Sequence, residues 1–244
     1  MIYIRGNEAY GDSWAPYVPD RASTMGVVVM VGQSNGNGTV VDPDYGSTAI
    51  AAAHPTLTPT VVQLGSQLVS YDTAVGPMPY LIEHMGGETS SPVLINRCIN
   101  GQGEVSVRQV QIPGAVADLV ALGLTPADVN GLWLVHGEED NTTEVLANAY
   151  KNRALERIVR SAEGTFPNAW VGISLLRSTT YGGAFYAPVR EAQVAAAGRR
   201  GNRFLVDTVN PTPIPLQDSV HYTPGYGGGY NISADRFWAG AGGS

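Results

Sequence analysis

The sequence predicts an α/β fold in which a central parallel sheet is covered by helices on both faces. Five short apolar runs have the composition of strands that are buried on both sides. The stretches between them carry apolar residues at helical spacing, and strands that alternate with helices indicate parallel pairing. The 244 residues fit one large domain, residues 1–244, because no linker or repeat divides the chain.

The predicted strands are rich in aliphatic residues, and the first is the clearest. Residues 26–31 read Gly-Val-Val-Val-Met-Val and stop at a glycine-rich turn. The other predicted strands are residues 92–99, 131–135, 169–176 and 203–206. The predicted helices are residues 78–85, 115–124, 141–162, 187–197 and 232–239. Residues 1–25 are polar and aromatic and are expected to form an irregular lead-in.

Composition and charge argue against several classes of partner. The net charge is -7, from 14 Lys+Arg against 21 Asp+Glu, and no basic cluster is present, so no nucleic-acid partner is expected. No apolar stretch approaches the ~20 residues that span a bilayer, and no signal peptide is evident, so no membrane contact is expected. These features predict a soluble protein, either cytoplasmic or virion-associated. Its oligomeric state is not predicted.

Cys98 is the only cysteine, which excludes an intrachain disulfide and a thiolate metal cluster. It follows an apolar run and is expected to be a small buried residue.

Ser34 occupies the position where a nucleophile would be useful. In parallel α/β sheets, active sites form beyond the carboxyl ends of the strands. Ser34 follows the strand of residues 26–31 on a turn flanked by glycines, where the next backbone N–H groups can face a developing oxyanion. The alternative is a turn serine that caps the following element.

Asp218 and His221 form a second candidate constellation, Asp-Ser-Val-His. A serine hydroxyl needs a general base near neutral pKa, and histidine supplies one. An aspartate three residues upstream can accept from the imidazole and fix its tautomer. Taken alone, an Asp-x-x-His sequence is weak evidence for such a pair.

The segment Trp133 to Asp140 begins as a strand and ends in a carboxylate-rich turn. Its acidic residues could simply cap the next helix. Alternatively, His136 or the backbone of Gly137 lines a site. A metal site from His136, Glu138 and Asp140 is conceivable but lacks a recognised ligand spacing, so neither a metal nor another cofactor is expected.

Five short motifs follow one another along the chain. They are Gly32-Gln33-Ser34-Asn35, Gly76-Pro77, Asn100-Gly101-Gln102-Gly103, Trp133 to Asp140, and Asp218 to Tyr222. Their kind and order resemble the SGNH hydrolase superfamily, and more narrowly its sialate O-acetylesterase and acetylxylan esterase branch. The resemblance implies a flavodoxin-like three-layer α/β/α sandwich and hydrolysis of an ester, usually an acetyl group on a sugar hydroxyl.

The resemblance also implies roles for individual residues. Ser34 would attack the acyl carbon, His221 would transfer the proton, and Asp218 would orient His221. The oxyanion would be bound by the Ser34 N–H and by a glycine N–H from Gly101 or Gly103.

One departure concerns the oxyanion hole. Where the family has a glutamine that donates to the oxyanion, this chain has His136, which we expect to donate from a ring nitrogen instead.

The expected substrate is an acetylated glycan or another small ester. Candidate substrate-binding residues are Gln33, Asn35, Glu138 and Tyr222, and the loops 40–60 and 177–187 are expected to set specificity. The alternatives are a short-chain lipase or thioesterase of the same fold, and a catalytically weakened glycan-binding module. The absent signal peptide makes a phage-borne enzyme a further hypothesis.

Overall fold

The computed structural model describes residues 26–37, 53, 55–63, 67–69, 76–86, 89, 91–176, 185–208, 212–217 and 221–242. Asp218, the lead-in of residues 1–25 and most of the two predicted specificity loops lie outside the described residues.

Seven strands form one sheet in the order β3-β2-β4-β1-β5-β6-β7. Their bounds are β1 (Val27–Gly32), β2 (Thr60–Gln63), β3 (Gln67–Val69), β4 (Val93–Asn96), β5 (Gly131–Val135), β6 (Trp170–Ser174) and β7 (Arg203–Val206). All neighbouring pairs are parallel except β2 and β3, which are antiparallel at one edge. The predicted parallel sheet is therefore confirmed, and β1 lies at its centre.

All five predicted strands are present, although those at residues 92–99 and 169–176 are shorter than expected. The sequence interpretation missed β2 and β3. Both strands are short, and β2 directly follows a stretch that was interpreted as a loop.

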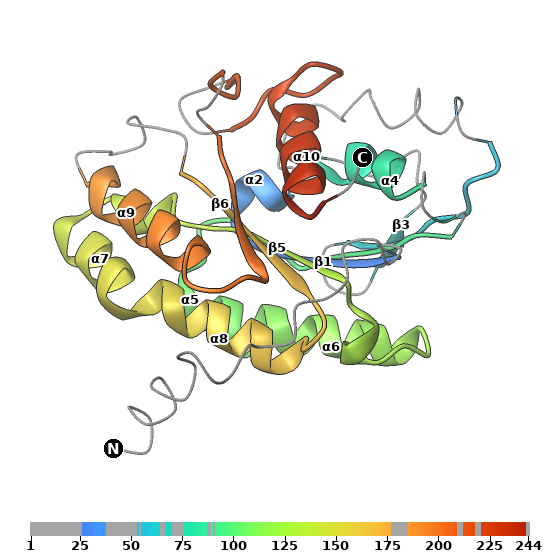
Figure 1. The fold of residues 1–244 in the computed structure, drawn as a ribbon, viewed down its shortest axis with the longest axis horizontal. Coiled ribbons are helices and arrows are strands. Elements are labelled where there is room, and N and C mark those ends of the chain that lie inside the picture. The colour runs from blue at the N-terminus through green and yellow to red at the C-terminus, as the bar shows by residue number, and fades with distance from the viewer. Residues whose placement is uncertain are drawn as a thin grey trace.

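The helices lie on both faces of the sheet (Figure 1). Their bounds are α2 (Ser34–Asn37), α4 (Met78–Gly86), α5 (Glu104–Ser106), η2 (Val107–Gln111), α6 (Ile112–Ala121), η3 (Pro126–Asp128), η4 (Glu139–Asn141), α7 (Glu144–Ala149), η5 (Tyr150–Ala154), α8 (Leu155–Thr165), α9 (Tyr186–Ala197) and α10 (Gly229–Gly240). Helices α6, α8 and α9 pack on one face, and α4 and α10 on the other. This is the expected three-layer α/β/α arrangement.

Two predicted helices differ from the observed ones. The helix expected at residues 115–124 begins earlier, at Glu104, and passes through the π-helix η2 before α6. The helix expected at residues 141–162 begins at α7, where the Thr143 hydroxyl accepts from the Leu146 N–H. It then passes through a second π-helix, η5, into α8.

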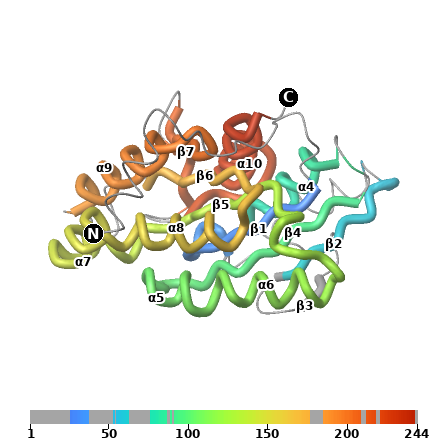
Figure 2. Tube along the Cα trace, turned by 60° about the horizontal axis from the view of Figure 1, so that its bottom comes forward, coloured from blue at the N-terminus to red at the C-terminus, as the bar shows by residue number. Residues whose placement is uncertain are grey.

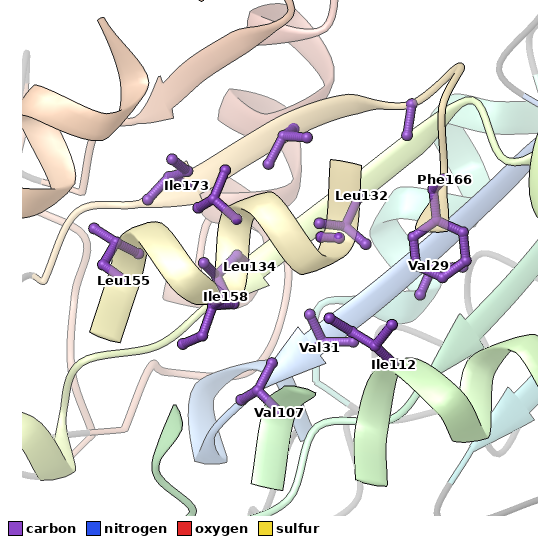
Figure 3. Packing of buried hydrophobic residues seen from close by; sticks show 14 of the residues in the cluster. Val29, Val31, Val107, Ile112, Leu132, Leu134, Leu155, Ile158, Phe166 and Ile173 are labelled. Carbon is purple, nitrogen blue, oxygen red and sulfur yellow. The ribbon is translucent and has the colours of Figure 1, made fainter. Parts of the chain in front are cut away.

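The core consists of two layers separated by the sheet. Because side chains alternate along a strand, Val29 and Val31 of β1 enter one cluster, while Val28 and Met30 enter the other. Figure 3 shows the first cluster, in which Val29 and Val31 lie opposite side chains of the helices. Burial on both faces explains why the β1 sequence is continuously apolar.

The strand order is visible in Figure 2, where β1 lies between β4 and β5. Among the residues that the structure describes, no helix is long and apolar enough to cross a membrane.

Candidate functional site

Three loops meet at the carboxyl edge of the central strands. β1 pairs with β4 on one side and with β5 on the other, in register along their length. The segments that follow these strands are residues 33–37, 97–103 and 136–141. They contain the first, third and fourth of the sequence motifs, so the fold brings those motifs to one edge.

Gly32 makes the turn that ends β1. Its φ is 138°, and an added Cβ would lie 1.9 Å from the carbonyl oxygen of Val135. Only glycine fits this close approach of two backbones. The next N–H, of Gln33, donates to the same Val135 carbonyl at 2.7 Å. The chain then turns into α2, whose first residue is Ser34, 8% exposed.

The side-chain amide of Gln111 holds the backbone of Gly32 from the other side. Its Oε1 accepts from the Gly32 N–H at 2.7 Å, and its Nε2 donates to the Gly32 carbonyl at 3.1 Å. Gln111 is the last residue of the π-helix η2 and is fully buried. Sequence reasoning missed it, because residue 111 lay outside the predicted helices and a glutamine gives no signal of which group it will bind.

Gln33 joins the three loops to one another. Its Nε2 donates to the carbonyl of Gln102 at 2.8 Å. Its Oε1 accepts from the N–H groups of Gly137, Glu138 and Glu139 at 3.0, 2.9 and 3.3 Å. Gln33 was predicted to bind substrate, but here it is buried and its amide is bonded to backbone. Its observed role is to position the loops.

Asn35 connects the Ser34 turn to the segment that carries His221. Its Oδ1 accepts from the Tyr222 N–H at 2.9 Å, a contact between residues 187 positions apart, and its Nδ2 donates to Glu138 Oε1 at 2.9 Å. The two distant segments of the predicted triad therefore meet. Within the described residues, no hydrogen bond joins the Ser34 hydroxyl to the His221 ring. Catalytic contacts are often loose in free enzymes.

His136, predicted as an oxyanion donor, is buried and lies against protein groups. Its side chain is 0% exposed and its Nε2 lies 3.1 Å from the carbonyl of Gln102, so Nε2–H donates to that carbonyl. The ring stacks on Tyr150 with centroids 5.6 Å apart, and its Nδ1 lies 3.3 Å from Asp140 Oδ2. Both ring nitrogens thus face protein groups in the free protein, and a contact of His136 with the oxyanion stays a prediction.

Burial makes His136 and Asp140 an unusual pair. Desolvation, the largest cause, lowers the pKa of His136 to about 4, against the opposing effect of nearby Glu138. Desolvation and then the charge of Glu139 raise the pKa of Asp140 to about 7. Because His136 is neutral and its Nε2 carries the proton, Nδ1 is left as an acceptor that faces the Asp140 carboxyl.

The two candidate oxyanion glycines differ in setting. Gly101 is exposed and has a φ of 62°. Gly103 is half-buried, with φ -84° and ψ -174°, and directly precedes α5. An added Cβ would meet no atom within 4 Å at either glycine.

Two other predicted contacts change character in the structure. Tyr222 was expected to contact substrate, but it is only 3% exposed and its ring packs edge-to-face on Tyr230, with centroids 5.8 Å apart. It belongs to the core. Glu138, in contrast, is half-buried beside Asn35, and its Oε2 is buried with no hydrogen-bond partner within the described residues. A substrate contact of Glu138 stays a prediction.

Cys98 is buried as expected, and burial raises the pKa of its thiol. Its Sγ lies so close to Gly36 that a Cβ there would come within 2.4 Å. In the part of the chain that the structure describes, no group of three or more His, Cys, Asp or Glu side chains is arranged to hold a metal ion.

Sequence comparison finds no matching family model and no matching curated protein. Structural comparison, in contrast, finds clear neighbours. A protein from Arabidopsis thaliana superimposes with a TM-score of 0.62 at 15% identity, covering 88% of this chain and 96% of that chain. XAC1771, a carbohydrate acetylesterase from Xanthomonas citri, superimposes with a TM-score of 0.61 at 16% identity. That match covers 88% of this chain and 55% of XAC1771, so this chain spans about half its length.

A third neighbour is the psychrotrophic esterase EstA of a Pseudoalteromonas species, with a TM-score of 0.51 and 13% identity over 88% of this chain and 96% of that chain. The structure of this chain thus resembles SGNH-type lipases and carbohydrate acetylesterases. At these identities the likeness establishes the fold, which is the predicted three-layer α/β/α sandwich.

Proposed function

We propose that this protein is a serine hydrolase of esters, with Ser34, His221 and Asp218 as its catalytic triad. The observation that carries the proposal is the hydrogen bond from the Tyr222 N–H to Asn35 Oδ1, 2.9 Å long. It fastens the segment containing His221 beside the turn containing Ser34. A nucleophile and its base must lie on adjoining segments, and these are 187 positions apart in the chain.

In the proposed mechanism, the Ser34 hydroxyl attacks the ester carbonyl as His221 takes its proton. The Ser34 N–H and one glycine N–H stabilise the oxyanion. His221 then gives the proton to the leaving alcohol, and an acyl-enzyme remains on Ser34. Water, activated by the same histidine, releases the acid, while Asp218 orients His221 throughout.

The proposed substrate class is an acetylated carbohydrate. XAC1771, with the same fold, is a carbohydrate acetylesterase, and three of the five sequence motifs of that branch meet at one sheet edge here. Glu138 lies next to the Ser34 turn, where its Oε1 accepts from Asn35 Nδ2 and has a further lone pair for a sugar hydroxyl. A virion-borne enzyme would meet such glycans on cell surfaces.

The decisive test is turnover of p-nitrophenyl acetate by the parent protein and by Ser34→Ala. The parent should hydrolyse the ester, and the variant should lose activity by a factor of about 10⁴ or more, as expected for loss of a nucleophile. Ser106→Ala, which removes a serine from α5, is the matched control and should retain the parent rate.

Two results would redirect the assignment. If the parent and Ser34→Ala are equally inactive while an acetylated glycan still binds, the protein is a glycan-binding module that kept the fold. If longer acyl chains are cleaved faster than acetyl, the assignment moves to a short-chain lipase or thioesterase. Labelling of Ser34 by a serine-reactive phosphonate, read by mass spectrometry, identifies the nucleophile directly.

A further inference from the structure

We infer that Gly103, rather than Gly101, supplies the second oxyanion N–H, and that Gln33 and His136 are positioning residues that hold its peptide in place. The inference rests on the proposed function and deepens it. It assigns a catalytic donor that the sequence left open, and it gives His136 a role that differs from direct contact with the oxyanion.

Two buried donors converge on the carbonyl of Gln102. Gln33 Nε2 donates to it at 2.8 Å and His136 Nε2 at 3.1 Å. Both side chains are buried, at 1% and 2% exposure. A carbonyl oxygen has two lone pairs, so these two bonds occupy its accepting capacity and fix its direction.

The Gln102 carbonyl and the Gly103 N–H belong to the same peptide unit. That unit is planar and trans, so its C=O and N–H point in opposite directions. Holding the carbonyl therefore aims the Gly103 N–H away from Gln33 and His136. Within the described residues this N–H has no hydrogen-bond partner, which leaves it available to a ligand atom.

Gly101 lacks this support. Its N–H shares a peptide with the carbonyl of Asn100, and no hydrogen bond to that carbonyl is formed among the described residues. Both residues are exposed. Oxyanion stabilisation depends on donors that are oriented before the reaction begins, and only the peptide of Gly103 meets that condition.

The ring of His136 is itself held in place. It stacks on Tyr150, with the ring planes within 5°, and Asp140 lies on its Nδ1 side at 3.3 Å. Its backbone carbonyl accepts from Gln193 Nε2 at 2.7 Å. Rotation of the ring away from Gln102 would break the stack, so the position of the donor is determined by packing as well as by the hydrogen bond.

The donor is tested by Gly103→Pro, in which the ring carbon Cδ replaces the N–H hydrogen. The φ of -84° at Gly103 lies close to the range that proline adopts, and the space around its Cβ position is open. We expect kcat to fall by about 10²–10³-fold with little change in KM. The matched variant Gly103→Ala keeps the N–H and should lose far less. Equal kcat values for the two variants would overturn the assignment.

The role of His136 is tested by comparing His136→Gln with His136→Leu. A glutamine can place its Nε2 near the position of the histidine Nε2, whereas leucine has no donor. We expect His136→Leu to lower kcat about tenfold with KM nearly constant, and His136→Gln to restore most of that loss. A loss that appears in KM, or that glutamine does not rescue, would contradict positioning.

A double-mutant comparison separates positioning from direct contact with the oxyanion. If His136 acts through Gly103, replacing it in the Gly103→Pro background should have little further effect on kcat. If the two losses multiply instead, His136 acts independently of Gly103 and the inference fails.

Nitrogen-15 NMR of the imidazole gives a result that does not depend on turnover. We expect the His136 proton on Nε2; a proton on Nδ1 would overturn the proposed hold on Gln102. If the parent protein neither hydrolyses p-nitrophenyl esters nor reacts with the phosphonate, the proposed function itself is refuted. Failure of the inference about Gly103 and failure of the proposed function are therefore distinguishable.

Discussion

The two edges of the sheet are held together by different chemistry. At the carboxyl edge, beside Ser34, the loops are joined by the neutral side chains of Gln33, Asn35 and Gln111. At the opposite edge, the start of β7 is held by ions: the guanidinium of Arg203, whose side chain is 0% exposed, donates to Glu163 Oε1 at 2.7 Å and lies 3.3 Å from Glu156 Oε2.

The difference fits the proposed chemistry beside Ser34. The Glu138 carboxylate already accepts from Asn35 Nδ2 there at 2.9 Å, and a further charge would alter the stability of the proposed oxyanion. Amides fix backbone groups in direction but add only dipoles. Far from the chemistry this restriction does not apply, and a buried arginine paired with carboxylates can tie β7 to α8.

The strongest expected effect comes from removing the buried ion pair at the start of β7. Glu163→Ala leaves the buried Arg203 with Glu156 as its remaining carboxylate, and should lower the free energy of unfolding by about 3–5 kcal/mol. Urea unfolding measures this loss. The kcat of the folded fraction should equal that of the parent, because the residue lies away from the site.

The matched control for Glu163→Ala is Glu191→Ala. It breaks the ion pair with Lys151, in which the side chains of Lys151 and Glu191 are 45% and 62% exposed. The loss in the free energy of unfolding should be under about 1 kcal/mol. Similar losses in the two variants would show that burial does not strengthen the dependence on charge at the β7 edge.

Replacing one of the amide side chains beside Ser34 should lower both the stability and kcat. Gln111→Leu leaves the N–H and carbonyl of Gly32 without their side-chain partners and should cost about 2–4 kcal/mol, because each unsatisfied buried group costs about 1–3 kcal/mol. We also expect kcat to fall at least several-fold, since Gly32 sets the turn that carries Ser34. Steady-state kinetics at a temperature where the variant is fully folded separates the two effects.

Gln111→Glu provides the partner experiment. A carboxylate still accepts from the Gly32 N–H but cannot donate to the Gly32 carbonyl, and it places a charge beside the Ser34 turn. If neutrality matters there, kcat of the fully folded variant should fall below that of Gln111→Leu. A kcat equal to that of the parent would remove the proposed contrast between the edges.

The smallest expected effect is a change in the pH dependence of stability when His136 and Asp140 are separated. Folding lowers the His136 pKa from 6.5 to about 4 and raises the Asp140 pKa from 3.8 to about 7. The folded and unfolded pairs therefore bind nearly the same number of protons at each pH, with the proton moved from histidine to aspartate. The parent should show little pH dependence of stability from this pair.

Replacing either residue alone should reveal the pH dependence of stability that comes from the other. Asp140→Asn leaves the lowered pKa of His136, so stability should be full above pH 6.5 and fall as the pH decreases toward 4. His136→Gln leaves the raised pKa of Asp140, so stability should be full below pH 3.8 and fall as the pH rises toward 7. Urea unfolding across this pH range should therefore give slopes of opposite sign for the two variants, and slopes of the same sign would contradict the pairing.

The sequence predicted the sheet well because burial on both faces leaves a strong pattern. The continuous apolar run of β1 and the glycine turn after it located the site edge without any structural information. Helix α5 and η2 were missed because residues 104–111 contain three valines, which favour strands when read locally. In the folded protein, packing of Val107 in the core stabilises the helical conformation of this segment.

Side-chain direction limited the prediction of the site. The first, third and fourth motifs lie at one edge of the sheet, but a sequence does not state which partner a buried polar group selects. His136 was expected to donate to the oxyanion, and nothing in the sequence indicated that its ring stacks on Tyr150 and bonds to the Gln102 carbonyl. Likewise, Tyr222 follows His221 in the sequence yet turns into the core.

The bond from the Tyr222 N–H to Asn35 is one of several that build the segment of His221 into the fold. The Gln217 N–H donates to the His221 carbonyl at 2.9 Å, and the Thr223 N–H donates to the Pro215 carbonyl at 3.2 Å. Ile214, which precedes this segment, is fully buried in the core. A change of chain length here would therefore disturb the core as well as the proposed base, so we expect new substrate-contacting loops to arise elsewhere on the molecule.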